Sequence, residues 1–113
     1  ALELLDADAI RASLDPALLP LLRHGEVAWE LPSTNAALLA RGGLPQGRFD
    51  FLLAEHQTAG RGRRERAWHA PPGGALCLSM NWTYVALPRG AGALSLATGV
   101  CVRRVLHHWG IEA

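Results

Sequence analysis

The chain has 113 residues, of which half are apolar and 19% are charged. This composition is typical of a folded globular domain and excludes a disordered or fibrous chain. The formal net charge of +1 favours no extended polyanionic partner. No apolar run approaches 18 residues and no signal-type segment is present, so we expect a chain without a membrane span. Two cysteines that match neither a disulfide framework nor a zinc motif favour a reducing, cytoplasmic location.

The N-terminal part of the chain predicts a helix followed by a strand. Residues 4–22 read as helical, with Asp6 as a cap for a first short helix. Pro16 opens a second apolar piece, which we expect to end at Gly25. Apolar and other residues then alternate over 27–31, the pattern of a half-buried strand.

A helix and a buried strand are predicted next. Pro32 ends the preceding strand, and Ser33 or Thr34 can cap a helix that runs to Arg41. Residues 51–56 form a short apolar run bounded by turn residues, which is typical of a buried strand.

The second half predicts a loop, a strand and a long helix. Residues 58–66 lack periodicity and read as a loop, and a turn follows at 71–74. Residues 76–83 alternate as a strand with Leu76, Leu78, Met80 and Trp82 on one face and Cys77, Ser79 and Asn81 on the other. The glycine-containing loop 58–66 would then be flanked by two buried strands.

The C-terminal part predicts a loop over 88–92 and the longest helix over 93–109. Gly110 supplies the helix stop, and Ile111 resembles the first residue of a new strand. The order of helices and strands indicates an α+β fold, or a mixed α/β layer.

The segment 57–68 carries the strongest chemical signal, because glycines alternate there with four of the eleven arginines (Arg61, Arg63, Arg64 and Arg66). Guanidinium groups bind phosphate or carboxylate in a bidentate manner, and glycines let backbone N–H groups approach an anion closely. Charge alone favours a solvated surface turn, and the interleaved glycines and the apolar strands on either side count against that interpretation. The segment is not a dinucleotide fingerprint, because Glu65 occupies the position of the third glycine.

A second polar cluster, Ser33-Thr34-Asn35, follows a strand and opens a helix. On spacing alone it is explained by helix capping. The alternative is a binding cluster, because Gln57 also follows a strand and sites form at strand ends in α/β sheets. The histidines form no metal-ligand pattern, so we expect no metal site in the chain.

Three motifs together make the chain resemble the catalytic domain of bacterial biotin–protein ligases. Residues 31–35 are similar to the family's S-T-N entry to a helix. Residues 54–68 resemble its A-x-x-Q-x-x-G-R-G-R-x-G-R-x-W loop, and residues 71–80 resemble the strand that follows. The resemblance extends from about Leu4 to the end of the chain.

The resemblance implies an ATP-dependent ligase. Biotin and ATP would form biotinyl-5′-AMP, and the biotinyl group would pass to a lysine of the biotin carboxyl carrier protein of acetyl-CoA carboxylase. Mg²⁺ is expected with ATP. It also implies a fold like that of class II aminoacyl-tRNA synthetases, and a homodimer is one expected assembly. No nucleic-acid or membrane partner is expected for this chain.

The resemblance also implies roles for individual residues. The loop would be mobile when empty and order around the anion, with Arg63 as the catalytic residue. The biotin site would contain Ser33, Thr34, Asn35, Gln57, Gly60, Arg61, Gly62 and Arg63. Loop closure and nucleotide contacts would come from Arg64, Arg66 and Trp68.

The chain departs from the family pattern in ways that bear on these expectations. Glu65 stands where the family usually has Gly, and Ala75 replaces a frequent Asn. The family's lysine segment is expected after Ala113, and the chain contains no lysine. We therefore expect residues 1–113 to be the N-terminal portion of a single biotin/lipoate ligase-type catalytic domain, inactive alone, without the winged-helix and C-terminal domains. A lipoate–protein ligase and an arginine-loop nucleic-acid-binding module are the alternatives.

Overall fold

The computed structural model describes residues 3–84, 86 and 89–112. It contains two compact units, one reaching Thr83 and the other starting at Tyr84. The first unit holds a three-stranded sheet, and the second holds one long helix. This arrangement confirms the predicted mixture of helices and strands. No helix in the described part of the chain is long and apolar enough to cross a membrane.

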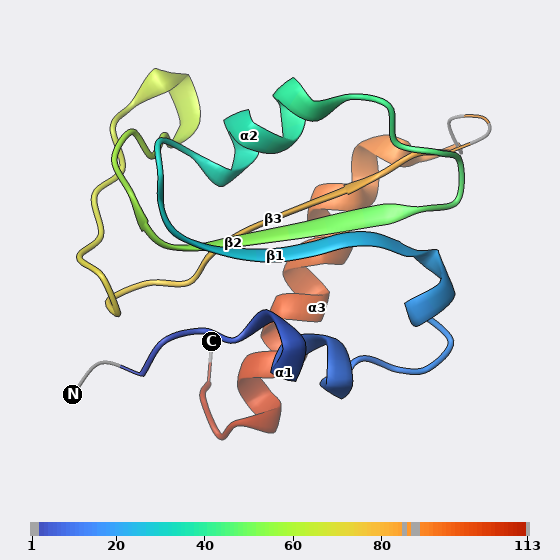
Figure 1. Cartoon of the computed structure of the whole chain (residues 1–113), viewed down its shortest axis with the longest axis horizontal. Helices are drawn as coiled ribbons and strands as arrows, with labels where there is room; N and C mark the ends of the chain where they lie inside the picture. The colour runs from blue at the N-terminus through green and yellow to red at the C-terminus, as the bar shows by residue number, and fades with distance from the viewer. Residues whose placement is uncertain (1–2, 85, 87–88, 113) are drawn as a thin grey trace. The chain divides into compact units, whose positions relative to one another are not determined.

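The sheet of the first unit is mixed. Its strand order is β1 (Leu22–Leu31), β2 (Phe49–Gln57) and β3 (Cys77–Trp82). Strand β2 lies in the centre, parallel to β1 and antiparallel to β3. Helices α1 (Ala7–Ser13) and α2 (Thr34–Arg41) lie on opposite faces of the sheet (Figure 1). Two short 3-10 turns lie between these elements: η1 (Leu19–Leu21) between α1 and β1, and η2 (Arg63–Glu65) between β2 and β3.

The core is built on β2. Its alternation places Phe49, Phe51 and Leu53 on the face toward α1, where they form a buried cluster. The partly buried residues packed against this cluster are Leu5, Ile10, Leu14, Leu21, Leu22 and Val27. Leu52 and Ala54 point to the opposite face and are also buried. Burial on both faces explains why the predicted strand 51–56 begins with four consecutive apolar residues, 51–54, and shows no alternation there.

Local signals set the ends of the two helices of this unit. Asp6 caps α1 as predicted, because its carboxylate accepts hydrogen bonds from the backbone N–H groups of Asp8 and Ala9. Helix α2 ends at Arg41, also as predicted.

The prediction for Gly25 was wrong. It does not end a helical piece but lies buried inside β1, which begins at Leu22. A Cβ atom at this position would come within 2.3 Å of Cε2 of Phe51. The glycine is therefore required because an aromatic ring of the neighbouring strand occupies the space of a side chain.

Replacing Gly25 with Ala is expected to destabilise the protein by about 1–3 kcal/mol, since the buried Phe51 ring has little room to move. Urea unfolding of the variant and the parent measures this difference. Gly99→Ala is the matched control, because Gly99 lies in a helix and a Cβ there would meet nothing within 4 Å. That control should be neutral or slightly stabilising. Equal destabilisation by both substitutions would contradict the packing argument.

Strand β3 has the predicted alternation but not the expected burial. Leu78, Met80 and Trp82 are 46%, 62% and 41% exposed, whereas Ser79 and Asn81 on the other face are partly buried. Helix α2 packs over β2 and β3 on that second face and covers the polar side chains. The expectation of two buried strands beside the loop therefore holds for β2 only.

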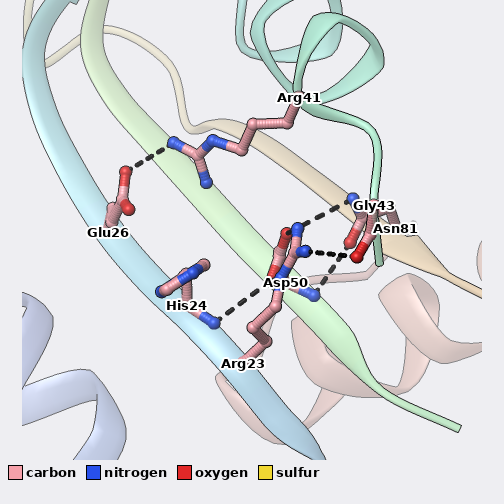
Figure 2. A network of polar contacts seen from close by, with 7 residues as sticks. All are labelled: Arg23, His24, Glu26, Arg41, Gly43, Asp50 and Asn81. Carbon is pink, nitrogen blue, oxygen red and sulfur yellow. Dashed lines mark hydrogen bonds and ion pairs between the residues drawn. The ribbon is translucent and has the colours of Figure 1, made fainter. Parts of the chain in front are cut away.

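A buried ionic network ties the three strands together (Figure 2). Asp50 in β2 is fully buried and accepts hydrogen bonds from Arg23 Nη2 at 2.6 Å and from the His24 backbone N–H at 3.1 Å. Asn81 of β3 accepts from the Asp50 backbone N–H at 2.8 Å. The hydrogen bond from Arg23 holds the pKa of the Asp50 carboxyl below its ordinary value, against the opposing effect of burial.

The same network reaches the C-terminal end of α2. Arg23 Nη1 donates to the backbone carbonyl of Gly43 at 3.0 Å, and Arg41 pairs with Glu26 of β1 at 2.6 Å (Figure 2). These contacts attach the last turn of α2 and the loop after it to the first strand.

The second unit contains η3 (Ala91–Ala93) and helix α3 (Leu94–His108). Gly110 follows the end of α3, as predicted for the helix stop, and has a φ of +77°. The Gly110 N–H donates to the His107 carbonyl and the Ile111 N–H donates to the Leu106 carbonyl. These are the two hydrogen bonds of a Schellman motif. Ile111 is not in a strand. Part of the predicted loop 88–92 lies outside the described residues.

Candidate functional site

The ends of β1 and β2 are joined by backbone hydrogen bonds. The N–H of Thr58 donates to Leu31 at 2.9 Å, and the N–H of Ala59 donates to Pro32 at 2.8 Å. The parallel pairing of the strands therefore continues into the segments that follow them. The start of α2 and the start of the arginine segment consequently lie at the same edge of the sheet (Figure 1).

Three polar side chains meet at this edge. Gln57 Oε1 accepts hydrogen bonds from the backbone N–H of Thr34 at 2.8 Å and from Thr34 Oγ1 at 3.1 Å. Thr34 Oγ1 also lies 2.7 Å from Ser79 Oγ of β3. Thr34 is buried, and the other two are partly buried. The structure thus brings together two residues singled out from the sequence, Thr34 and Gln57.

Ser79 is the member of this group that the sequence interpretation missed. Its position on the polar face of an alternating strand was visible, but that pattern alone fits a solvent-exposed face. Only the crossing of α2 over β3 shows that this face is covered and that Ser79 meets Thr34.

Ser33 and Asn35 are placed differently from Thr34. Ser33 is the N-cap of α2, and its Oγ accepts a hydrogen bond from the Ala36 N–H at 3.2 Å, which confirms the capping interpretation. Asn35 is exposed, and no hydrogen bond joins its side chain to the described part of the chain. The S-T-N segment therefore divides into a cap, a buried contact and an exposed side chain.

The arginine segment folds back on itself as a hairpin. The Trp68 N–H donates to Gly60 and the Gly62 N–H donates to Arg66, both at 2.7 Å. Between these bonds, Arg61 pairs with Ala67 in an antiparallel bridge. These bonds give the predicted loop a defined backbone path.

Gly60 connects this hairpin to the Thr34–Gln57 contact. It is buried, and a Cβ atom there would come 2.9 Å from the Trp68 carbonyl oxygen and 3.0 Å from Gln57 Nε2. The absence of a side chain therefore lets the base of the hairpin lie directly against the Gln57 amide.

The tip of the hairpin is strained. Arg64 and Glu65 both have left-handed backbone conformations, with φ values of 60° and 59°. This region suits glycine and costs other residues about 1 kcal/mol or more. A glycine at position 65 would adopt this conformation without the steric penalty, whereas Glu65 imposes strain at that point.

Glu65→Gly is expected to stabilise the hairpin by about 0.5–1 kcal/mol, because relief of the left-handed strain exceeds the entropy that glycine adds to the unfolded chain. Limited proteolysis within the hairpin, together with the unfolding midpoint, measures the effect. Glu112→Gly is the control, since φ is not positive at that described position. Faster cleavage of the Glu65→Gly hairpin would contradict the prediction.

The hairpin borders an open cleft of about 550 Å³, lined by Gly62, Arg63, Arg64, Arg66, Ala67 and Trp68. Trp68 is 61% exposed and presents an apolar face. No described residue forms an ion pair with any of these arginines. Their guanidinium groups therefore remain available to an anion.

The predicted residues thus form two neighbouring groups. Thr34, Gln57 and Gly60 lie at the edge of the sheet, and the arginine cleft lies along the hairpin that starts there. Asn35 is exposed next to the buried Thr34, and Arg61 contributes to the hairpin backbone. Another cavity of about 560 Å³ lies along α1 and is mainly apolar, away from both groups. Among the described residues no three His, Cys, Asp or Glu side chains are grouped to hold a metal ion.

Comparison with known proteins places these features in a family. Residues 32–108 match the model of the biotin/lipoate A/B protein ligase family, which is more than half of the chain. The chain is 42% identical over 115 residues to the bifunctional ligase/repressor BirA of Salmonella typhimurium, covering 98% of this chain and 32% of that protein. It is 41% identical over 108 residues to a biotin–[acetyl-CoA-carboxylase] ligase of Mycobacterium tuberculosis, covering 86% of this chain and 40% of that protein.

The chain therefore spans about a third of the length of the first relative and two fifths of the length of the second. The matched region contains α2, the Gln57 strand end, the arginine hairpin and β3, which are the elements that build the candidate site. The chain belongs to the biotin/lipoate A/B protein ligase family.

Proposed function

We propose that the full-length protein is a biotin–protein ligase and that this chain supplies one side of its biotinyl-adenylate site. The observation that carries the proposal is the contact between Thr34 and Gln57 beside an arginine hairpin. The similarity to ligases at 41–42% identity supports biotin as the substrate. The sheet would then belong to a single catalytic domain with a fold like that of class II aminoacyl-tRNA synthetases.

The proposed reaction has two steps. An oxygen of the biotin carboxylate attacks the α-phosphorus of ATP, and pyrophosphate leaves to give biotinyl-5′-AMP. The ε-amino group of a lysine on the biotin carboxyl carrier protein then attacks the activated carbonyl, and AMP leaves. Mg²⁺ is expected to accompany ATP, bound to its phosphates.

The arginine hairpin fits the charges of this reaction. Arg61, Gly62 and Arg63 would hold the biotin carboxylate and the α-phosphate, where guanidinium groups offset negative charge during attack. Arg64, Arg66 and Trp68 would contact the nucleotide and cover the intermediate. A mixed anhydride hydrolyses readily, so a hairpin that closes over it keeps water out between the two steps.

The Thr34–Gln57 edge would then take the other end of biotin. Ser33 would line the same edge from its capping position, and Asn35 from the exposed side of α2. The partly buried Gln57 amide can form directional hydrogen bonds with the neutral polar ring of biotin. The arginines bind the negatively charged groups instead and do not select this ring.

Incubation of the full-length protein with ATP, the carrier domain, and either biotin or lipoate tests this function. Mass spectrometry of the carrier domain should show attachment of biotin to one lysine and no attachment of lipoate. Exclusive transfer of lipoate would favour the second activity represented in the family name. Tight binding of a short RNA with no ligation of either acid would overturn the assignment.

A further inference from the structure

The hydrogen bonds at the edge of the sheet have a fixed direction. The backbone N–H of Thr34 can only donate, so the Gln57 atom facing it at 2.8 Å must be the carbonyl oxygen, Oε1. The same oxygen can only accept, so the Thr34 hydroxyl 3.1 Å away must donate its single proton to it.

This assignment fixes the role of Ser79. Because the Thr34 hydroxyl proton is already donated, the contact at 2.7 Å requires the Ser79 hydroxyl to donate to Thr34 Oγ1. Both hydrogen bonds therefore have the same direction: Ser79 of β3 donates to Thr34 of α2, and Thr34 donates to Gln57 of β2.

The far end of this chain of bonds is the Gln57 amino group. With Oε1 held by Thr34, Nε2 is turned toward Gly60, where an added Cβ would lie 3.0 Å from it. No residue in the described part of the chain accepts a hydrogen bond from Nε2. Both of its N–H groups are thus left for a ligand.

We propose that Ser79 is a positioning residue that, through Thr34, locks the Gln57 amide with its N–H donors facing the ligand. The inference rests on the proposed biotin ligase function. The amide NH2 group of Gln57 can only donate, so it selects a ligand group that accepts, such as a carbonyl oxygen. With the biotin carboxylate assigned to the arginine hairpin, the ureido carbonyl oxygen of biotin is the acceptor that meets Gln57.

The selectivity of binding tests this role, because a merely structural effect of Ser79 would not change it. The probes are biotin and 2-iminobiotin, in which a nitrogen donor replaces the ureido oxygen. The full-length protein should bind biotin more tightly than 2-iminobiotin. In the 2-iminobiotin complex, the N–H donors of Gln57 would face the nitrogen donor of the ligand. Titration calorimetry of both probes gives the ratio of their dissociation constants.

Ser79→Ala is expected to weaken biotin binding about three- to tenfold, the loss of roughly one hydrogen bond, and to lower the biotin/2-iminobiotin selectivity by a similar factor. Ser79→Thr keeps the hydroxyl group and should restore both values. The KM for ATP should stay unchanged. Ser95→Ala, at an exposed serine of α3, is the matched control.

Thr34→Val provides a second variant, which removes the middle hydroxyl but keeps the backbone N–H. It should lower the selectivity in the same way, and combining it with Ser79→Ala should add no further loss, because the two hydroxyl groups act in series. An unchanged selectivity ratio in both single variants would overturn the role of Ser79. Failure of the unsubstituted protein to bind biotin would instead overturn the proposed function.

Discussion

Gln57→Ala in the full-length protein is expected to weaken biotin binding about 30- to 100-fold. The substitution removes the oxygen that accepts two hydrogen bonds from Thr34 and the amino group that faces the ligand. It also leaves the first N–H of α2 without its side-chain acceptor. Losses of this size correspond to about 2–3 kcal/mol, within the range for buried partners left unpaired. Titration calorimetry with biotin measures the change.

Gln46→Ala is the matched control, because Gln46 is the other glutamine of the chain and lies exposed in the loop after α2. It should bind biotin as the parent does. If Gln57→Ala bound biotin with the parent affinity, the edge formed by Thr34 and Gln57 could not be the biotin site.

Asp50→Asn is expected to destabilise the protein by about 3 kcal/mol at neutral pH. Asp50 is fully buried and receives hydrogen bonds from Arg23 and the His24 backbone (Figure 2). An amide in its place would turn an N–H donor toward the guanidinium group and leave that charge without its counter-ion. Urea unfolding at pH 7 measures the loss. Asp8→Asn is the control, because Asp8 is exposed and its ion pair with Arg11 should contribute under 1 kcal/mol.

The same variant should change how stability depends on pH. The Asp50 pKa is lowered in the folded state, mainly by the hydrogen bond from Arg23, so the folded state favours the charged form. Its contribution is present above the unfolded pKa of about 4 and is lost as the pH falls through the folded pKa. The difference between the parent and Asp50→Asn should therefore shrink in acid. A constant difference from pH 7 to strongly acidic solution would contradict the assignment.

The sequence predicts local structure best where one physical signal dominates. Asp6 and Gly110 mark helix ends because their side-chain or backbone chemistry satisfies terminal groups locally. The run from Phe51 to His56 predicts a buried strand because burial on both faces removes alternation. Gly25 was misinterpreted because the reason for a glycine there, the ring of Phe51, lies 26 positions away in the chain and is brought near only by pairing of β1 with β2.

The residues of the candidate site also divide into those that the sequence predicted and those that it could not. Gln57 and Thr34 were found because residues at the ends of parallel strands share an edge of the sheet. Ser79 and Asp50 could not be found, since their partners come from other strands and from α2. A serine in an alternating strand and an aspartate before an apolar run each fit a solvated position equally well. The strain at Glu65 was visible only as a departure from the family glycine until the backbone angles gave its cause.

The release of biotinyl-5′-AMP from the full-length protein tests the central claim most directly, because it depends on the arginine hairpin and the edge of the sheet acting as one site. Arg63→Ala removes a guanidinium group that lines the hairpin cleft and has no ion-pair partner among the described residues. Stopped-flow fluorescence measures the off-rate of the intermediate. Arg104→Ala, at an exposed arginine of α3, is the control and should leave this rate unchanged. We expect Arg63→Ala to raise the off-rate about 10- to 100-fold. An off-rate equal to that of the parent would contradict the assignment of the hairpin to the biotinyl-adenylate site.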